Sequence, residues 1–224
     1  MSLSNAKVYE IDGTNLTTEI IYQISNAKKG EIKLTLTAES KRKVLASRKY
    51  VDEIVEKEEP VYGINTGFGA LSSKHIDKKD LSQLQYNLIR SHCTGVGSPF
   101  PKLTTRAIML LRANCLASGF SGVSIECIEL LFDFINHDII PVVPEKGSVG
   151  ASGDLAPLSH IALALIGEGE VIYDGKNVKS DFAIDQIQKK PVQLKAKDGL
   201  ALINGTAVMA ALGSLALYEA KKII

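Results

Sequence analysis

The sequence predicts a mainly α-helical fold with a few short strands. Apolar residues recur at helical spacing in successive segments from about residue 80 to the last residues of the chain. Strand-like runs are short, and two of the three lie near the N-terminus. Because no internal repeat or low-complexity segment divides the chain, we expect a single folding unit over residues 1–224.

The N-terminal part is expected to combine strands with helices. Residues 7–12 and 31–37 are short strand candidates on either side of a helix that starts near Asn15. A charged, solvent-facing helix is expected over residues 39–59. It stops before Pro60 because proline disfavours helical backbone in the residue that precedes it.

The rest of the chain is expected to be helical apart from one hairpin. Further helices are expected at about 80–92, 104–119 and 125–139, then after Asp154 and again after Asn204. The stretch 169–178 predicts a β-hairpin, because Asp174-Gly175 at its centre is a favoured turn pair.

Composition and charge indicate a soluble, intracellular protein, and we expect it to be cytoplasmic. The chain is 45% hydrophobic and 23% charged, with a formal net charge of +1. We expect no membrane span, and the N-terminus lacks the apolar core of a signal peptide. Lys41-Arg42-Lys43 is interpreted as a solvated helix face because acidic residues lie nearby. No nucleic-acid or membrane partner is therefore expected.

The cysteines give no sign of a metal site. Cys93, Cys115 and Cys127 show no CxxC or His-Cys spacing typical of zinc ligands. We expect all three to be reduced and mostly buried, and we expect no metal.

The most informative segment is residues 147–160, GSVGASGDLAPLSH. Within it, Ala151-Ser152-Gly153 has the composition that lets a backbone cyclise, because glycine permits its own amide nitrogen to fold back onto the carbonyl of Ala151. Loss of water from the ring and of the Ser152 hydroxyl would leave a methylidene carbon conjugated with an imidazolone. Taken alone, such a glycine-rich turn before a helix can also be a structural loop or an anion cradle.

The residues after the tripeptide predict a helix start. Asp154 is a candidate N-cap, and Pro157 falls in the first turn, where its missing N–H costs little. The positive end of that helix would face the ring and stabilise negative charge formed there.

Three other positions carry candidate functional side chains. Tyr62 lies in the glycine-rich run VYGINTGFG, His92 ends the helix over 80–92, and Asn204 precedes a helical run in LINGT. Each also has a structural interpretation: packing for the tyrosine, a helix-dipole contact for the histidine, and an N-cap for the asparagine. The helix that ends at His92 is expected to begin with a capping box formed by Asp80 and Gln83.

These segments occur together in the order and approximate spacing seen in the ammonia-lyases that carry a methylidene-imidazolone (MIO) cofactor. From about Ile11 to its end the chain resembles that family, and within it most closely the members that act on histidine. The pair Ser91-His92 carries this preference, because members acting on tyrosine or phenylalanine generally have another pair there. An imidazole can hydrogen-bond a substrate imidazole as donor or acceptor.

The resemblance implies a fold and an assembly. The fold would be the N-terminal half of the fumarase/aspartase-like helical lyase fold, with short strands and hairpins around the MIO loop. Family members are about twice as long, so the resemblance implies a truncated chain without the C-terminal helical half. They are homotetramers whose active sites draw on several subunits, so we expect the isolated chain to be inactive or incomplete.

The resemblance also implies the roles of the site residues. Ala151, Ser152 and Gly153 would form the MIO with assistance from Asp154, and no external cofactor would be needed. The resemblance further implies that Tyr62 removes the substrate β-proton and that Asn204 polarises the ring. Ser91, His92 and Gly69 would bind the substrate.

The implied reaction is the non-oxidative elimination of ammonia from L-histidine to give trans-urocanate, the first step of histidine degradation. Alternatives are a tyrosine or phenylalanine ammonia-lyase, an MIO aminomutase, or a non-catalytic scaffold that retains the lyase half for interaction. A generic anion-binding helical domain would not explain why all four motifs occur together.

Overall fold

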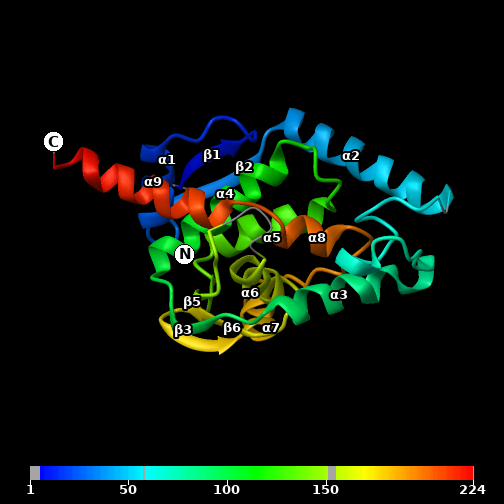
Figure 1. The fold of residues 1–224 in the computed structure, drawn as a ribbon. Coiled ribbons are helices and arrows are strands. Elements are labelled where there is room, and N and C mark those ends of the chain that lie inside the picture. The colour runs from blue at the N-terminus through cyan, green and yellow to red at the C-terminus, as the bar shows by residue number, and fades with distance from the viewer. Residues whose placement is uncertain (1–5, 58, 151–154, 224) are drawn as a thin grey trace.

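The fold places a helical body beside a small N-terminal strand pair (Figure 1). The computed structural model describes residues 6–57, 59–150 and 155–223. Ala151, Ser152, Gly153 and Asp154 lie outside the described residues. The mainly helical fold class predicted from the sequence is confirmed.

The N-terminal part contains two parallel strands, β1 (Lys7–Ile11) and β2 (Ile32–Leu36), joined through helix α1 (Thr18–Asn26). The helix begins after Thr17 because the Thr17 hydroxyl accepts a hydrogen bond from the amide of Ile20. Helix α2 (Ala38–Lys57) follows, with Lys41–Lys43 exposed on its surface as expected.

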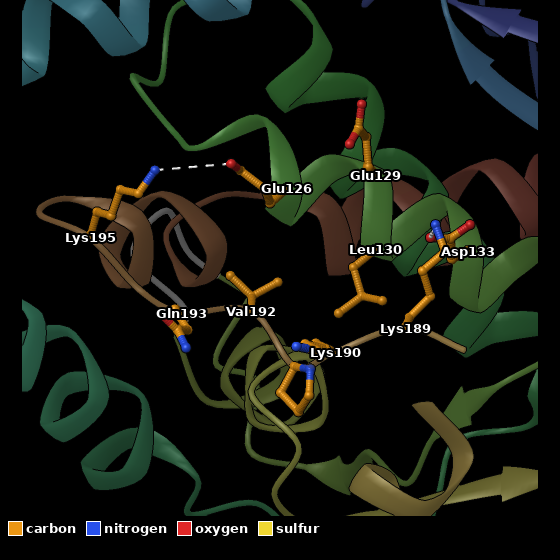
Figure 2. A pocket seen from close by; sticks show the side chains of 10 residues that line it. Glu126, Glu129, Leu130, Asp133, Lys189, Lys190, Val192, Gln193 and Lys195 are labelled. Atoms are coloured by element: carbon orange, nitrogen blue, oxygen red, sulfur yellow. Dashed lines mark ion pairs between the residues drawn. The ribbon is translucent and has the colours of Figure 1, made fainter. Parts of the chain in front are cut away.

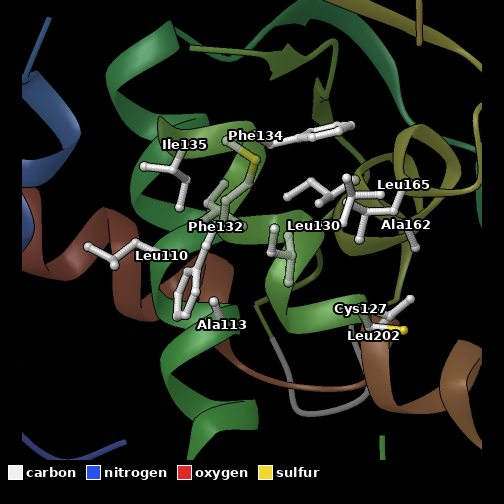
Figure 3. Close-up of a cluster of buried hydrophobic side chains, with 14 of the residues drawn as sticks. Leu110, Ala113, Cys127, Leu130, Phe132, Phe134, Ile135, Ala162, Leu165 and Leu202 are labelled. Atoms are coloured by element: carbon white, nitrogen blue, oxygen red, sulfur yellow. The ribbon is translucent and has the colours of Figure 1, made fainter. Parts of the chain in front are cut away.

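The body is built around helices α4 (Lys102–Ala117) and α5 (Ile125–Asn136). Both are largely buried: most of their apolar side chains form the core, and α4 also buries Arg106 and Arg112. Figure 3 shows side chains from α4 and α5 packed together, with side chains from two further helices against them: Leu110, Ala113, Cys127, Leu130, Phe132, Phe134, Ile135, Ala162, Leu165 and Leu202.

The helices around this core are α3 (Leu81–His92), α6 (Ala156–Leu165), α7 (Ser180–Gln186), α8 (Asp198–Ile203) and α9 (Ala207–Lys221). Helix α8 packs on α3 and α6, and α9 packs on α1 and α4. Two short 3₁₀ turns, Gly69–Leu71 and Lys78–Asp80, precede α3. The fold therefore brings the C-terminal helices against the first half of the chain.

The remaining strands are short. Strand β3 (Val96–Pro99) pairs antiparallel with β5 (Pro144–Lys146), and β6 (Glu170–Tyr173) pairs with both β4 (Ile140–Pro141) and β7 (Lys176–Lys179). The predicted hairpin is confirmed, since Asp174 and Gly175 connect β6 to β7 with φ angles of 47° and 75°.

Two sequence-based expectations about helix ends were wrong. The Asp80 side chain makes no cap hydrogen bond, and Gln83 instead donates to Asn87, so the capping box is absent. Helix α6 spans Ala156–Leu165, and its predicted N-cap, Asp154, lies outside the described residues. Pro157 does lie in the first turn, as expected.

The second error concerns Asn204, which does not cap the helix that follows it. Its amide donates to the carbonyl of Leu200 at 3.0 Å, so Asn204 closes α8. Helix α9 starts at Ala207 after Thr206. The two residues between Asn204 and α9 separate two helices that the sequence alone presents as nearly one apolar run.

The sequence analysis expected no apolar run long enough to span a membrane, and this expectation was wrong. By length and composition alone, Asp198–Lys221 is long and apolar enough to cross a membrane. In the structure the stretch is divided between α8 and α9.

All three cysteines are free, but they are not mostly buried. Cys127 is buried and Cys93 half-buried, whereas Cys115 is exposed. Burial raises the pKa of the Cys93 thiol to about 12, which keeps it protonated at neutral pH.

Candidate active site

The segment after His92 lies directly against the segment that leads to Ala151. Val96 in β3 pairs with Lys146 in β5. A Cβ added to Gly147 would lie 3.1 Å from the Cα of Gly95, so the two backbones touch where neither residue carries a side chain. Strand pairing thus brings together two motifs that are about fifty residues apart in the sequence.

His92 is held in one tautomer at the end of α3. Its Nδ1 lies 2.8 Å from the carbonyl oxygen of Leu88. Because a carbonyl oxygen only accepts, Nδ1 carries the proton of the neutral ring, and Nε2 is left with a lone pair. Ser91 supports this arrangement, since its hydroxyl donates to the same carbonyl at 3.0 Å and lies 3.1 Å from Nδ1. The imidazole therefore presents a hydrogen-bond acceptor to a ligand.

Tyr62 lies on a loop that packs against α8. Gly63 adopts a φ of 78°, and a Cβ there would lie 2.9 Å from Cδ2 of Leu200. Buried Asn65 closes the loop by accepting from the Val61 amide and donating to the Glu59 carbonyl. The Tyr62 ring is 61% exposed, so the loop holds the phenol at the surface of this chain.

The exposed ring of Tyr62 makes an edge contact with Phe68 at 6.4 Å between centroids. Together with Gly69, Ser72 and Ser73, it lines an open pocket. Tyr62 and Gly69, which were predicted to serve the same site, thus share one surface depression.

Asn204 lies at the junction of α8 and α9, which Arg112 supports from α4. The buried guanidinium of Arg112 donates to the carbonyl of Ala201. A Cβ on Gly205 would collide with Nη1 of Arg112, so a larger residue here would displace the guanidinium. The Asn204 side chain itself is exposed.

The segment that leads to Ala151 also approaches α9. A Cβ on Gly150 would lie 3.8 Å from Sδ of Met209, in the first turn of that helix. The first turn of α9 therefore lies near Gly150, the last described residue before the tripeptide, and α6 begins at Ala156. Helix N-termini favour negative charge, so their positions fit a ring whose oxygen gains charge when a nucleophile adds.

A buried carboxylate that the sequence analysis missed anchors α8. Asp198 accepts hydrogen bonds from the amide and hydroxyl of Ser124, both at 2.7 Å, and from the amide of Lys195 at 2.8 Å. Nη1 of Arg48 lies 3.4 Å away. Burial raises the pKa of Asp198, although these hydrogen bonds and Arg48 act in the opposite direction. An aspartate at the start of the apolar run DGLALI was the available sequence signal.

Another pocket of the described chain lies between α5 and the segment that precedes α8. Figure 2 shows Glu126, Glu129, Leu130 and Asp133 of α5 on one side and the segment 189–195 on the other. Its charges are partly paired, with Lys189 2.9 Å from Asp133 and Lys195 4.0 Å from Glu126. None of the predicted site residues lines it.

The described residues contain no group of three or more His, Cys, Asp or Glu side chains placed to hold a metal ion. The residues around the tripeptide do fit an internally formed imidazolone. Gly147 and Gly150 leave space against Gly95 and Met209, and a helix starts just after the tripeptide.

The helical fold and this set of motifs are those of an amino-acid lyase family. Residues 16–224 match the aromatic amino acid lyase family, and the chain belongs to that family. Among curated relatives, the histidine ammonia-lyase of Myxococcus xanthus is 49% identical over 213 residues. The match covers 95% of this chain but 41% of the relative, so the chain spans about two fifths of that enzyme's length.

Solved structures agree with this family. Ergothionase from Treponema denticola, an ergothioneine-degrading enzyme, superposes with a TM-score of 0.91 at 30% identity, covering 97% of this chain and 43% of its own. Tyrosine aminomutase from Streptomyces globisporus superposes with a TM-score of 0.84 at 40% identity, covering 93% and 38%. The fold is therefore that of the N-terminal part of these enzymes.

Proposed function

We propose that this chain is the electrophile-bearing, N-terminal portion of a histidine ammonia-lyase, which eliminates ammonia from L-histidine to give trans-urocanate. The observation that carries the proposal is the Ser91-His92 pair with its fixed tautomer. Since His92 offers Nε2 as an acceptor, it suits a substrate ring that bears an N–H, as imidazole does. The 49% identity to a histidine ammonia-lyase supports the same substrate.

The tripeptide Ala151-Ser152-Gly153 would supply the cofactor from within the chain, with Asp154 assisting its formation. A methylidene-imidazolone at this position would provide an electrophilic carbon for the substrate amine. The amide of Asn204 and the N-termini of α6 and α9 would favour negative charge on the ring oxygen. No external cofactor is required.

The chain's own side chains would then orient the substrate and move its proton. His92 accepts a hydrogen bond from the substrate imidazole, with Ser91 fixing the acceptor geometry. Tyr62 takes the proton from the substrate β-carbon, and Gly69 leaves room for the substrate beside it. Loss of that proton and of the amine leaves the α,β-unsaturated acid and ammonia.

The exposure of this site supports an assembly. Tyr62, Gly69, Ser91 and Asn204 are all exposed in the isolated chain, whereas elimination chemistry benefits from exclusion of water. We propose that further polypeptide, corresponding to the part of the relatives that this chain does not span, covers the site within a cytoplasmic homotetramer.

An MIO aminomutase is the second candidate, and the 40% identity to a tyrosine aminomutase favours it. Such an enzyme, or a tyrosine or phenylalanine ammonia-lyase, would use the same ring with another substrate. A non-catalytic scaffold is the alternative from a different class. Product analysis separates all of these, because only a lyase releases ammonia and only the scaffold leaves every amino acid unchanged.

The first test is the intact mass of the purified chain, with a peptide map across residues 151–154. We expect a mass lower by two waters, localised to Ala151-Ser152-Gly153. The matched control is Ser152→Ala, which lacks the hydroxyl and should retain the full mass. An unmodified wild-type mass would show that this chain does not form its own electrophile. Incubation with histidine and tyrosine, with and without the missing portion, then identifies the product.

A further inference from the structure

His160 connects two segments of the candidate site, helix α6 and the loop that follows His92, through one hydrogen bond. It lies on α6, is half-buried, and its Nε2 accepts the backbone amide of Gly95 at 3.2 Å. Because that amide is a donor, Nε2 must be unprotonated, and the neutral ring carries its proton on Nδ1. The contact links α6 to the loop that follows His92.

The packing around this bond leaves almost no freedom. A Cβ on Gly95 would lie 3.0 Å from Nε2 of His160 and 3.1 Å from Cβ of Pro144. A Cβ on Gly147 would lie 3.1 Å from Cα of Gly95 and 3.4 Å from Cβ of Ala156. Three segments thus meet closely at two glycines, where a Cβ would crowd the neighbouring segments, and the imidazole supplies a side-chain hydrogen bond at that point.

The three segments carry different parts of the proposed chemistry. Gly95 is three residues beyond His92, and Gly147 is four residues before Ala151. Ala156, on the same helix as His160, opens α6 just after the tripeptide. A shift of the Gly95 loop would therefore move the substrate-recognising end of α3 relative to the electrophile-forming loop.

We propose that His160 is a positioning residue that, as a neutral acceptor for the Gly95 amide, holds the His92 segment in register with the loop leading to Ala151. The contact stands on geometry alone, and its consequence for catalysis rests on the proposed function. Burial also lowers the pKa of His160, which favours the neutral ring that this contact requires.

The test compares two substitutions of His160 that differ in whether the new side chain can accept a hydrogen bond. His160→Gln places an amide oxygen close to the position of Nε2 and can still accept, whereas His160→Leu fills similar space without an acceptor. Hydrogen exchange of the Gly95 amide is the readout. We expect exchange roughly tenfold faster in His160→Leu, because a lost hydrogen bond changes local opening by about that factor, and near wild-type exchange in His160→Gln.

A spectroscopic signature and a control variant complete the design. In the wild-type chain, the ¹⁵N resonance of His160 Nε2 should be that of an unprotonated nitrogen coupled to the Gly95 amide. His137→Leu removes another half-buried histidine, at the end of α5, and should leave Gly95 exchange unchanged. Circular dichroism confirms that each variant is folded before exchange is compared.

Two outcomes would overturn the proposal: unchanged Gly95 exchange in His160→Leu, or exchange in His160→Gln as fast as in His160→Leu. The yield of the dehydrated tripeptide, measured by mass in the same samples, reports the consequence for the site. We expect that yield to fall in His160→Leu and to recover in His160→Gln. If the wild-type chain shows no dehydration, this chain does not form the proposed electrophile by itself, while the exchange data still decide the role of His160.

Discussion

At the scale of single residues, the proposed substrate choice depends on which nitrogen of His92 carries a proton. The Leu88 carbonyl accepts a hydrogen bond from Nδ1–H, so in the neutral ring Nε2 can only accept from a ligand. Sequence identified the residue, but the tautomer follows from the helical geometry that places the carbonyl of residue 88 beside side chain 92. A side chain that can only accept a hydrogen bond discriminates between substrates better than one that can both donate and accept.

We therefore expect His92→Leu to impair histidine turnover in the assembled enzyme that contains this chain. Loss of one substrate hydrogen bond should lower kcat/KM for histidine by about 10- to 100-fold. Steady-state kinetics of urocanate formation measures this, with Asn87→Ala on the same helix as the control. Equal kcat/KM in His92→Leu and the wild type would exclude His92 from substrate recognition.

At the scale of elements, the short helix α8 owes its position to the buried carboxylate of Asp198. A six-residue helix has little intrinsic stability, so its tertiary contacts decide where it lies. Asp198 ties its first turn to Ser124 and Arg48, and Leu200 in the same turn supports the loop of Tyr62. The same helix ends at Asn204, so one anchor positions two of the predicted site residues.

Asp198→Ala should destabilise the fold by about 3–5 kcal/mol, because it leaves Arg48 and the Ser124 donors buried with a partner missing. Asp198→Asn should cost less, about 1–3 kcal/mol, since one oxygen can still accept. Urea denaturation followed by circular dichroism measures both free energies. Glu53→Ala, which removes an exposed partner of Lys49, serves as the control and should be near neutral. A cost for Asp198→Ala no larger than that control would rule out the anchor.

At the scale of the whole molecule, two half-buried histidines link stability to pH. Burial lowers the pKa of His160, and it lowers that of His137 as well, with Asp133 opposing and Lys29 and Lys189 reinforcing the shift. Below the ordinary value of about 6.5, the unfolded chain binds protons that the folded chain does not. Their contribution to stability is thus fully present above that value and is lost as pH falls toward the lowered pKa values.

We expect the free energy of unfolding to fall between pH 7 and pH 5, and to fall less steeply in His160→Gln than in the wild type. Urea titrations at several pH values measure the two slopes. His137→Gln should reduce the slope independently, because the two imidazoles lie on different helices. Parallel curves for the wild type and His160→Gln would show that His160 does not contribute.

The sequence by itself determined the mainly helical class, the approximate bounds of the long helices and the β6–β7 hairpin. It also determined the set of motifs that places the chain in its family. These features are local, because helical periodicity, turn pairs and short motifs are encoded by neighbouring residues.

Only the tertiary structure decided that Asn204 ends α8, that Cys115 is exposed, and that Asp198 meets Arg48. It also decided that His160 meets Gly95, because such contacts join residues far apart in the chain. The contact partners of these residues are selected by tertiary packing, and the local sequence pattern does not predict which residues will meet.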